Sequence, residues 1–487
     1  MSFDPIVLSF ERTLRRDPLA PLVVSPERQA TVGEVDALAR AALHALESAG
    51  PASLPPGTAV GLVAANGPGF LASFLALRRA GLTAVLLDGQ TPGAEALRIV
   101  RALGAAALLR CRCAWPQGPE DWTLMRPEPE DEASPPLPPR PDLLSDWAVI
   151  KLTSGSTGLP RGIATPAEAL IADDANLTAT MGLRPDDRLL TTIPLSHSYG
   201  LSSLAMPALL RGTPLVIPEA GTLFDPFDAV ERAGATVFPT VPAYLDALLR
   251  LSEPPRRPPT LRLVLTAGAP LGPATAGRFR ETFGLPVHVF YGASECGGIC
   301  YDREGDAGER GTVGQPVEGV QVLLDPTDPT DPSDSHPGVV TVRSAAVAAG
   351  YLPDPDPRLA AGRFVGGDLA VWQNGELALR ARLDDLVNIK GKKVNPREVE
   401  EILCALPGVA EVVVLGVPVP DRSGERLRAV IACEPGRLSV DQVLAWSRER
   451  LAPHKVPRSV ILVPELPRTP RGKLDRPALV ALRSGDA

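Results

Sequence analysis

The sequence predicts an α/β protein with a large N-terminal domain of αβ-layered subdomains, which includes a small β-barrel-like part, and a small α+β C-terminal domain. Two observations support this fold class. Segments with a helical period alternate with short apolar runs, which is typical of parallel sheets. The pattern changes near residue 384, so we place residues 1–383 in the large domain and 384–487 in the small one.

The first elements form a βαβ unit. Residues 31–49 have the pattern of an amphipathic helix. Residues 59–64 and 84–87 are short apolar runs typical of buried strands, and a helical pattern over 67–80 connects them. We therefore expect two parallel strands joined by a crossover helix.

The middle of the chain contains a connection and a second series of alternating units. Residues 114–146 are proline-rich and acidic, and we expect them to be a surface connection. Alternating helical and apolar segments resume over 147–295. Residues 311–380 instead contain short strands separated by turn residues, and they predict a small barrel or an antiparallel sheet.

The C-terminal module contains a helix start at Asn395. Asn395 can cap the helix, Pro396 suits its first turn, and Glu398 can reach back to the backbone of the cap. The apolar residues that follow share one helical face, and they are Val399, Ile402, Leu403 and Leu406. The apolar stretch 409–417 then predicts a strand.

Composition and charge exclude several classes of protein. The net charge of −8 over 487 residues provides no basic surface for a nucleic acid. The most apolar stretch, 59–81, contains Asn66, Pro68 and two arginines, so we expect no transmembrane segment. The N-terminus lacks the pattern of a secretory signal. The six cysteines form no zinc-like pairs, which favours free thiols and a cytoplasmic location.

Lysine is scarce in this chain. Of the 49 basic residues only six are lysine, namely Lys151, Lys390, Lys392, Lys393, Lys455 and Lys473. Arginine and lysine are not interchangeable, because an ammonium is a compact point charge and a guanidinium is a planar fork. Five of the six lie in the last hundred or so residues, and the pattern assigns no role to Lys151 or Lys455.

Residues 152–162, Leu-Thr-Ser-Gly-Ser-Thr-Gly-Leu-Pro-Arg-Gly, have the composition of a phosphate-binding loop. The glycines allow a tight turn and a close approach to a ligand. The hydroxyl groups and the cation of Arg161 would suit a polyphosphate. The stretch is not the GxxxxGK[ST] loop of other nucleotide-binding proteins. The alternative interpretation is a Ser/Gly-rich surface turn.

Four further motifs follow in order. They are Tyr-Gly-Ala-Ser-Glu at 291–295, Gly-Gly-Asp-Leu at 366–369, Arg-Leu-Asp-Asp at 382–385 and Pro-Arg-Thr-Pro-Arg-Gly-Lys at 467–473. With the loop at 152–162, this ordered set resembles the adenylate-forming (AMP-binding) superfamily. That superfamily includes acyl-CoA synthetases, aryl-CoA ligases, luciferases and the adenylation domains of peptide synthetases. The resemblance covers nearly the whole chain.

The resemblance implies a site for ATP. The loop would hold the β- and γ-phosphates through Thr153, Ser154, Gly155, Ser156, Thr157, Gly158 and Arg161. The adenine would be bordered by Gly268, Ala269 and Pro270, and Tyr291, followed by Gly292, would stack on it. Each of these residues also has an ordinary structural interpretation, because glycines and prolines are common in turns.

The resemblance also implies the groups that surround the reacting atoms. Ser294 would contact the α-phosphate and Glu295 would ligate Mg²⁺, a role that suits a carboxylate. Asp368 would bind the ribose hydroxyls, and Arg382 would support the ribose or a phosphate. Lys473 would bridge the substrate carboxylate and the α-phosphate. The alternatives are a surface acid for Glu295, a turn residue for Asp368 and a salt-bridge partner for Arg382.

In the superfamily the small domain is mobile and serves two half-reactions. Here Asp384 matches the hinge. Rotation would exchange Lys473 for the face that carries Lys390, Gly391, Lys392 and Lys393, which could meet the phosphates of coenzyme A or an acidic carrier protein. A solvated basic patch is an equal alternative for this face.

Four positions depart from the usual superfamily pattern. Arg161 replaces a lysine in the loop and could hold phosphate differently. Gly366 replaces a threonine, Ala381 a glycine and Asn388 a frequent lysine. The first and last of these three could alter the second half-reaction.

The acyl substrate is predicted from the segment Pro-Leu-Ser-His-Ser-Tyr-Gly at 194–200. His197 resembles the superfamily residue between the acyl pocket and the thiol tunnel, with core packing as the alternative. No aspartate lies over 194–204 to pair with an amine, which disfavours an amino acid. Other residues expected to line the pocket are Phe238, Tyr244, Gly297 and Gly298. The two glycines favour a long or flat acyl group, unless they only allow a backbone turn.

Three functions remain open at this level. The first is a ligase that activates a fatty or aryl carboxylic acid with ATP and Mg²⁺ and transfers it to coenzyme A. The second performs the same adenylation but loads the phosphopantetheine of an acyl carrier protein. The third is a catalytically inactive adenylate-binding module, against which the retained Glu295, Asp368 and Lys473 argue.

Overall fold

The computed structural model describes residues 4–48, 54–127, 147–153, 161–219, 222–326, 337–383, 387–389, 392–418, 425–468 and 474–482. By its internal contacts the chain divides into two units. The first comprises Met1–Leu323, Thr341–Gly366 and Trp372–Ala378, and the second comprises Leu324–Val340, Gly367–Val371 and Leu379–Ala487. The predicted boundary at residue 384 lies outside the described residues and stays a prediction.

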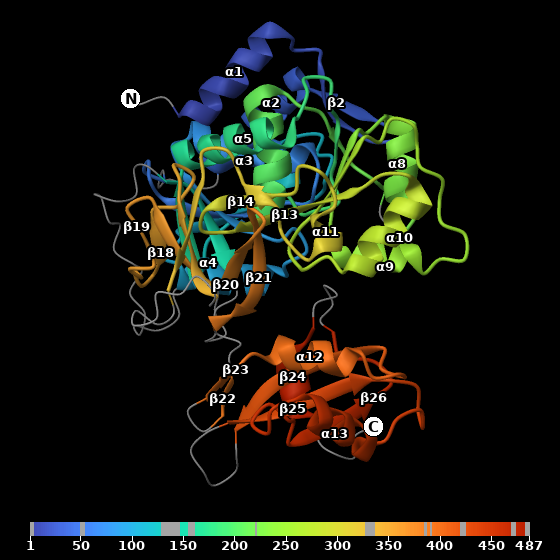
Figure 1. Ribbon diagram of the computed structural model, residues 1–487. Helices are drawn as coiled ribbons and strands as arrows, with labels where there is room; N and C mark the ends of the chain where they lie inside the picture. The colour runs from blue at the N-terminus through green and yellow to red at the C-terminus, as the bar shows by residue number, and fades with distance from the viewer. Residues whose placement is uncertain are drawn as a thin grey trace. The chain divides into compact units, whose positions relative to one another are not determined.

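The larger of the two main sheets has nine strands in the order β15-β14-β13-β12-β11-β9-β10-β1-β2 (Figure 1). The strands from β13 to β1 are parallel to their neighbours, whereas β14, β15 and β2 pair antiparallel at the two edges. The bounds are β1 Pro21–Val24, β2 Gln29–Thr31, β9 Leu189–Leu190, β10 Leu215–Val216, β11 Val237–Thr240, β12 Leu263–Thr266, β13 Val287–Ala293, β14 Gly297–Tyr301 and β15 Gln315–Pro316.

The second sheet has seven strands in the order β18-β8-β7-β4-β3-β5-β6. The four strands β7, β4, β3 and β5 are parallel, and β8, β18 and β6 are antiparallel to their neighbours. The bounds are β3 Ala59–Val63, β4 Thr83–Leu87, β5 Ala107–Cys111, β6 Trp122–Met125, β7 Trp147–Thr153, β8 Arg161–Pro166 and β18 Gly350–Leu352. The prediction of an α/β protein with parallel sheets is confirmed, and antiparallel strands extend both sheets.

One hydrophobic core lies between the two sheets. It takes Val60 and Leu62 from β3 and Leu263 and Leu265 from β12, together with buried side chains of several helices. Those helices are α1 Pro5–Arg16, α2 Val32–Ser48, α3 Pro68–Arg79, α5 Ala167–Met181 and α7 Met206–Arg211. Helix α3 is buried on nearly every side, which fits its continuous run of apolar and small residues.

The outer faces of the two sheets carry their own cores. In β3 the alternate residues Ala59 and Val63 pack with α4 (Gly93–Ala102). In β12 the alternate residue Val264 packs with three helices, which lie together in Figure 1, namely α8 Asp225–Ala233, α9 Pro242–Leu249 and α10 Pro273–Phe283. Successive strand residues point to opposite faces, so each parallel strand supplies both layers.

The βαβ unit predicted near the N-terminus is confirmed as β3, α3 and β4. The predicted helix over 31–49 is α2. Both strands are apolar on both faces, as strands buried between helical layers must be.

Of the two forms predicted for the segment 311–380, a small barrel or an antiparallel sheet, the structure shows a sheet, in which β19 and β20 pair antiparallel. Among the described residues it forms no closed barrel. It supplies most of a five-stranded sheet of order β16-β17-β20-β19, in which β21 also pairs with β20. Its short strands β15 and β18 join the two main sheets instead. The bounds are β16 Gln321–Asp325, β17 Gly338–Arg343, β19 Leu359–Ala360, β20 Arg363–Gln373 and β21 Glu376–Arg382.

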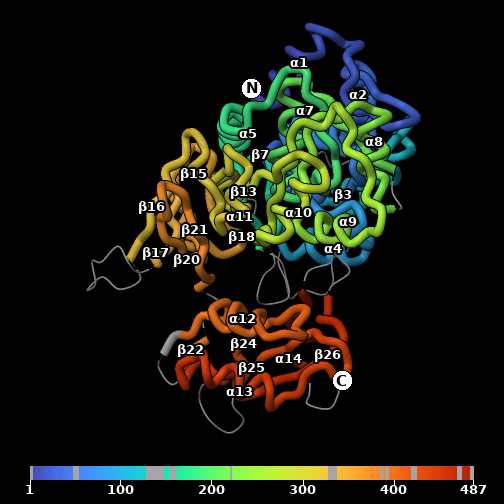
Figure 2. Tube along the Cα trace, turned by 45° about the vertical axis from the view of Figure 1, so that its right-hand side comes forward, coloured from blue at the N-terminus to red at the C-terminus, as the bar shows by residue number. Residues whose placement is uncertain are grey.

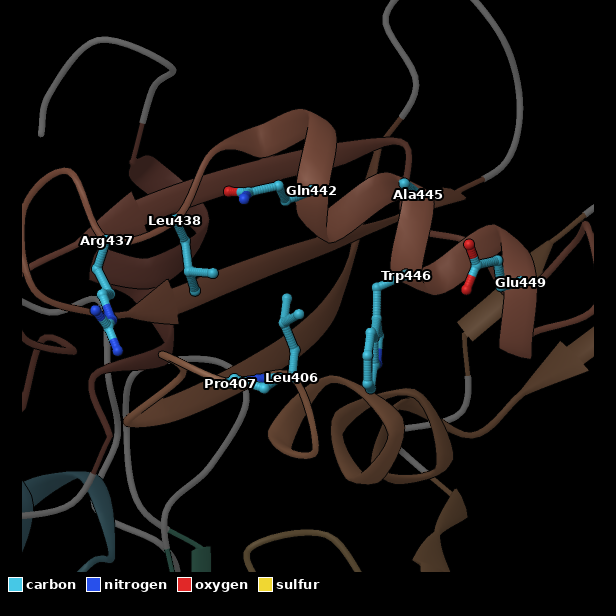
Figure 3. A pocket seen from close by; sticks show the side chains of 8 residues that line it. All are labelled: Leu406, Pro407, Arg437, Leu438, Gln442, Ala445, Trp446 and Glu449. Atoms are coloured by element: carbon cyan, nitrogen blue, oxygen red, sulfur yellow. The ribbon is translucent and has the colours of Figure 1, made fainter.

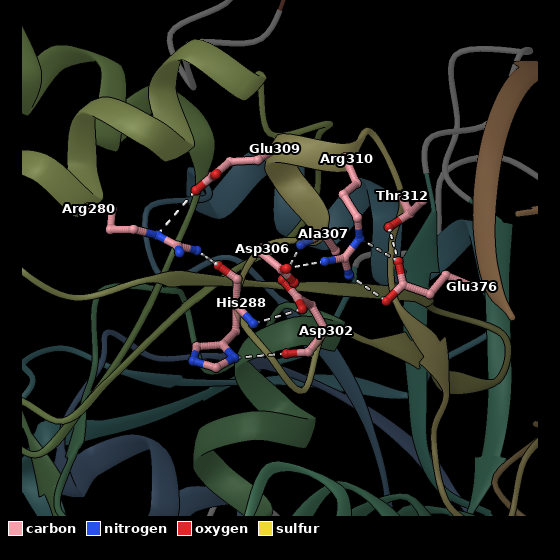
Figure 4. Close-up of polar contacts among 10 residues, drawn as sticks. Arg280, His288, Asp302, Asp306, Ala307, Glu309, Arg310, Thr312 and Glu376 are labelled. Atoms are coloured by element: carbon pink, nitrogen blue, oxygen red, sulfur yellow. Dashed lines mark hydrogen bonds and ion pairs between the residues drawn. The ribbon is translucent and has the colours of Figure 1, made fainter. Parts of the chain in front are cut away.

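Within the first unit, polar contacts connect the start of β21 with α11 and α10 (Figure 4). Glu376 at the start of β21 accepts from the guanidinium of Arg310, which ends the short helix α11 (Ala307–Arg310). Thr312 donates to the same carboxylate at 2.6 Å. Glu309 of α11 also contacts Arg280 of α10 at 3.1 Å. These contacts hold the start of β21 beside α11 and link α11 to α10.

The C-terminal part of the second unit contains a three-stranded sheet of order β24-β25-β26 (Figure 2). Helices α12 and α13 pack on one face, and α14 packs on the other. A two-stranded hairpin, β22–β23, precedes them. The bounds are β22 Val387–Ile389, β23 Lys392–Val394, α12 Pro396–Cys404, β24 Glu411–Pro418, β25 Glu425–Ala432, α13 Val440–Arg450, β26 Ser459–Val463 and α14 Arg476–Ala481.

The start of α12 confirms part of its prediction. The side chain of Asn395 accepts from the backbone N–H of Arg397, and Pro396 occupies the first turn. Glu398 does not reach back to the cap, because its carboxylate contacts the ammonium of Lys455 at 2.5 Å. That contact also gives Lys455 a structural partner.

Among the described residues, every helix is too short or too polar to cross a bilayer.

Candidate active site

The centre of the candidate site is the turn between β13 and β14, which carries Glu295. The two strands form an antiparallel hairpin, and Gly297 has φ +70°, a conformation that favours glycine. Two contacts hold the turn on either side of its tip. The Ser198 hydroxyl donates to the Ser294 hydroxyl at 2.7 Å, and the carbonyl of Glu295 accepts from the backbone N–H of Ala348 at 2.8 Å.

The side chain of Glu295 has a specific partner. The hydroxyl of Tyr351, in β18, donates to Oε1 of Glu295 at 2.9 Å. Burial and the neighbouring carboxylate raise the pKa of Tyr351, so the phenol stays protonated and keeps its donor role. One carboxylate oxygen is thereby fixed in place, and Glu295 itself is half-buried.

Arg161 lies on the other side of Tyr351. Its guanidinium lies over the Tyr351 ring, 4.1 Å from the centroid. It also donates to the carbonyl of Asp354 at 3.2 Å and contacts the Asp356 carboxylate at 3.5 Å. The predicted phosphate ligand is therefore held by protein groups at the β8–β18 edge, and its phosphate role stays a prediction.

The donor set fits a magnesium ion bound together with a nucleotide. Mg²⁺ usually takes one or two carboxylates and completes its shell with waters and substrate phosphates. Across the described ranges no group of three or more acidic, histidine or cysteine side chains could form a closed protein cage. Glu295, with one oxygen bonded to Tyr351, matches a site in which one carboxylate holds the ion and waters and substrate phosphates supply the other ligands.

The predicted phosphate loop connects two antiparallel strands. Thr153 ends β7 and pairs in register with Arg161 at the start of β8. Ser154, Gly155, Ser156, Thr157 and Gly158 lie outside the described residues. The positions of the two flanking residues place the ends of this loop at one edge of the seven-stranded sheet.

The predicted adenine-side residues lie at one end of the nine-stranded sheet. Gly268, Ala269 and Pro270 are exposed directly after β12. Tyr291 and Gly292 lie on the neighbouring β13, where Thr266 of β12 pairs with Val289. Ligands of open parallel sheets bind beyond the carboxyl ends of the strands, and these residues are at that end.

His197 is exposed and directly precedes the helical stretch of α6 (Ser198–Gly200), the π-helix Leu201–Ala205 and α7. The next residue, Ser198, makes the contact to Ser294. His197 is thus the chain neighbour of a residue that contacts the Glu295 turn. Its gating role stays a prediction.

Phe238 and Tyr244 were predicted to line the acyl pocket, and the structure gives both a packing role. Phe238 is fully buried in the outer core, edge-on to Tyr244 at 5.6 Å between ring centroids. The Tyr244 hydroxyl donates to the carbonyl of Leu223 at 2.7 Å. Their place in an acyl pocket stays a prediction.

The glycines at 297 and 298 do not by themselves leave space for an acyl group. A Cβ at Gly297 would lie 2.2 Å from the Asp173 carboxylate, and one at Gly298 would lie 2.6 Å from Leu177. Both partners belong to α5. Close packing of the turn against this helix therefore requires small residues, and the sequence-based argument for a long or flat acyl group loses its basis.

Asp368 and Arg382 are brought together in the second unit. Nε of Arg382 lies 3.1 Å from Oδ1 of Asp368, which is only partly exposed. They come from the paired strands β20 and β21. The predicted ribose-binding carboxylate and its supporting cation are therefore neighbours, although their role with a ribose stays a prediction. The departures at Gly366 and Ala381 lie buried on the same two strands.

Several predicted residues lie outside the described residues, namely Asp384, Lys390, Gly391 and Lys473. The backbones of Lys392 and Lys393 form β23, opposite Ile389 and Asn388 of β22. The hinge, thiol-side and catalytic-lysine roles stay predictions.

The structure adds two buried charged residues that sequence reasoning missed. Lys151 in β7 and Asp173 in α5 are each 3% exposed. Burial lowers the pKa of Lys151 and raises that of Asp173. A lysine inside the apolar run 147–152 was the available signal, whereas nothing distinguishes Asp173 from a surface acid of an amphipathic helix.

A hollow of about 460 Å³ lies elsewhere, on the C-terminal module (Figure 3). Its lining includes Leu406, Arg437 and Trp446 from the ends of α12 and α13 and their connections. No residue predicted for the active site lines it.

Comparisons with known proteins agree with this arrangement. A family model of the AMP-binding enzymes matches residues 10–352, and a model of their C-terminal domain matches residues 398–473. Feruloyl-CoA synthase from Amycolatopsis sp is 31% identical over 484 residues, which are 95% of this chain and 96% of that protein.

Solved structures are similar over nearly the whole length. The amide bond synthetase McbA from Marinactinospora thermotolerans has a TM-score of 0.78 and 27% identity, covering 98% of this chain and 99% of that one. ATP-bound MatB from Rhodopseudomonas palustris has a TM-score of 0.80, covering 97% and 98%, and its 24% identity supports the fold alone. This chain belongs to the AMP-binding enzyme family, as an AMP-forming acid–thiol ligase.

Proposed function

We propose that this ligase activates an uncharged aliphatic or aryl carboxylic acid and transfers the acyl group to the thiol of coenzyme A. The observation that supports this proposal best is the Glu295 turn. It lies at the carboxyl end of the parallel strands, beside Tyr291 and the exposed Gly268–Pro270 segment, with its carboxylate oriented by Tyr351. The relationship to feruloyl-CoA synthase over nearly the full length supports an aryl acid.

The first half-reaction joins two anions, so charge is the main obstacle. The substrate carboxylate attacks the α-phosphorus of ATP, and pyrophosphate leaves with the bonding electrons. Mg²⁺, when bound, reduces the charge on the phosphates. Glu295 would hold this ion, Lys473 would bridge the carboxylate and the α-phosphate, and Asp368 with Arg382 would orient the ribose. Such fixed charges stabilise the transition state more than the separated substrates.

The second half-reaction needs different groups. The thiol attacks the carbonyl carbon of the acyl-adenylate, and AMP leaves. Neither Glu295 nor Lys473 is needed for this attack, because no new bond to phosphorus forms. Lys390, Lys392 and Lys393 would contact the phosphates of coenzyme A.

The acceptor has alternatives that the residues do not separate. An acyl carrier protein would present the same phosphopantetheine thiol. The related McbA is an amide bond synthetase, so an amine acceptor is a further arm of the test. We keep coenzyme A as the proposed acceptor, because the similar proteins feruloyl-CoA synthase and 4-coumarate–CoA ligase are named for transfer to coenzyme A.

The test has two stages. Pyrophosphate release is first measured with ATP, Mg²⁺ and a panel of aliphatic, aryl and amino acids. The active acid is then offered with coenzyme A, a phosphopantetheinylated carrier protein or an amine, and the product is identified by mass spectrometry. Release with an aryl or aliphatic acid and a coenzyme A thioester are expected. ATP binding without release for any acid would support the inactive module, and a dominant carrier or amide product would correct the acceptor.

A further inference from the structure

Strand β7 carries a lysine where its neighbours are apolar. Residues 147–150 are all buried, and Lys151 follows them at 3% exposure. A buried ammonium is costly unless opposite charges compensate it, and an apolar side chain of similar volume is often no less stable. Two carboxylates compensate it here, because Lys151 interacts electrostatically with Asp173 and Glu295.

The strand register brings Lys151 to the same side as Tyr351. Lys151 pairs with Ile163 of β8, and Ile163 pairs with Tyr351 of β18. Directly opposite residues of antiparallel strands share a face of the sheet. The ammonium and the phenol therefore both act on Glu295 from one sheet face.

Asp173 holds the turn from the side of α5. Its Oδ1 accepts from the backbone N–H of Gly298 at 2.9 Å. The three side-chain atoms of the carboxylate would lie 2.2–2.5 Å from a Cβ at Gly297, so the carboxylate packs directly against the backbone of the turn. Asp173 thus fixes the turn at Gly297 and Gly298, two and three residues after Glu295.

We propose that Lys151 and Asp173 are positioning residues, which hold the turn at 294–298 so that Glu295 presents its carboxylate to Mg²⁺ and ATP. Asp173 fixes the backbone, and Lys151 provides the cation that both carboxylates face. Neither residue touches the reacting atoms. The inference rests on the proposed function for the role of Glu295, whereas the contacts that fix the turn are independent of it.

The test compares Lys151→Met, Asp173→Asn and the double variant. Met removes the charge at similar volume, and Asn keeps an oxygen that can accept from Gly298. Each single change leaves a buried charge with fewer opposite charges, so its melting temperature falls. The double variant regains most of that loss. The matched control is Lys455→Met, which removes the surface contact to Glu398.

A positioning role is separated from a purely stabilising one by measuring the rates of adenylation and of thioester formation separately. The double variant should lose adenylation by about 10- to 100-fold, the usual effect of removing groups that support a metal ligand. Thioester formation from supplied acyl-adenylate should change by less than about twofold, because it does not use Glu295. Equal losses in both half-reactions, or wild-type adenylation in the double variant, would overturn the proposal.

A second measurement needs no substrate. Amide hydrogen exchange of a peptide covering 294–301 should be faster in the double variant than in wild type, while exchange over α10 stays the same. Unchanged exchange would overturn the proposal. If wild type releases no pyrophosphate with any acid, the proposed function fails, and the exchange measurement still decides whether the pair holds the turn.

Discussion

Glu295 shows how one side chain is prepared for its role by residues distant in sequence. Its carboxylate accepts from Tyr351 of β18, and the Tyr351 ring is covered by Arg161 of β8. A carboxylate with one oxygen already bonded has fewer orientations open to it, so less freedom is lost when a metal ion binds. The Arg161 guanidinium therefore covers the Tyr351 ring, and the Tyr351 hydroxyl bonds Glu295 beside the turn.

Tyr351→Phe tests the role of this hydroxyl. The change removes the hydrogen bond to Glu295 and keeps the ring under Arg161. A hydrogen bond to a charged group contributes about 1.5–3 kcal/mol, so kcat/KM for adenylation should fall by about 10- to 150-fold. Pyrophosphate release at varied Mg²⁺–ATP measures this loss.

The control is Tyr301→Phe, which removes a hydroxyl from the other end of β14. Tyr301 lies six residues after Glu295, and its ring stacks on His288 with 5.7 Å between ring centroids, a contact that the substitution keeps. Activity equal to wild type in Tyr351→Phe would show that the hydrogen bond to Glu295 has no part in adenylation.

Motifs reveal some residues of the site and hide others. Glu295 and Asp368 lie within ordered motifs, so sequence alone identified them as candidates. Tyr351 lies between turn residues, and its role depends on β18 joining β8. Phe238 looked like a pocket residue because it is aromatic in a strand, but alternation in β11 directs it into the outer core.

At the scale of elements, buried ion pairs fix the loops that precede strands. Asp187, just before β9, is 1% exposed and accepts from the Arg262 guanidinium, the Thr236 hydroxyl and the Arg184 backbone N–H. Burial alone would raise the pKa of Asp187, but these donors outweigh burial and hold its pKa below the ordinary value. The carboxylate links the loops that enter β9, β11 and β12.

Asp187→Asn should therefore lower the free energy of unfolding at pH 7 by about 2–3 kcal/mol. A depressed folded-state pKa stabilises the protein above the unfolded value of about 3.9 and loses that contribution as the pH falls through the folded pKa. The difference between wild type and variant should thus be complete at pH 7 and shrink below about pH 4. Urea unfolding across this range measures it.

Asp228→Asn is the control, because it breaks an exposed i,i+4 pair with Arg232 in α8. Such pairs contribute about 0.3–0.5 kcal/mol, so little change is expected. Equal destabilisation by the two variants, or a difference for Asp187→Asn that grows in acid, would contradict the role given to Asp187.

The elements were predictable where their hydrophobic period was clear. β3, α3 and β4 appear within a few residues of their predicted bounds, because their apolar runs are continuous. The antiparallel pairing of β7 with β8 was not predictable, because an apolar run does not encode the direction of its partner. The described residues of 311–380 form a sheet and not the alternative barrel, because β15 pairs with β14 and β18 with β8, which belong to the two main sheets.

At the scale of the whole molecule, the two family models cover different candidate residues of the site. The model that ends at residue 352 contains Glu295 and Tyr351, and the C-terminal model ends at Lys473. Lysine scarcity acquires a consistent explanation at this scale. Lys151 belongs to the buried pair beside the turn and Lys455 to a contact with Glu398. The remaining four lysines all lie in the C-terminal part.

Those four lysines should divide between the two half-reactions. Lys473→Ala should reduce adenylation by about 10²- to 10³-fold, because a charge that stabilises the transition state is lost, and should leave thioester formation from supplied acyl-adenylate less affected. The triple change Lys390→Ala, Lys392→Ala and Lys393→Ala should do the opposite, raising the KM for coenzyme A while pyrophosphate release stays near wild type. Stopped-flow measurement of each half-reaction separates the two. If both variants lose the same half-reaction, one C-terminal domain does not serve two chemistries in the way proposed here.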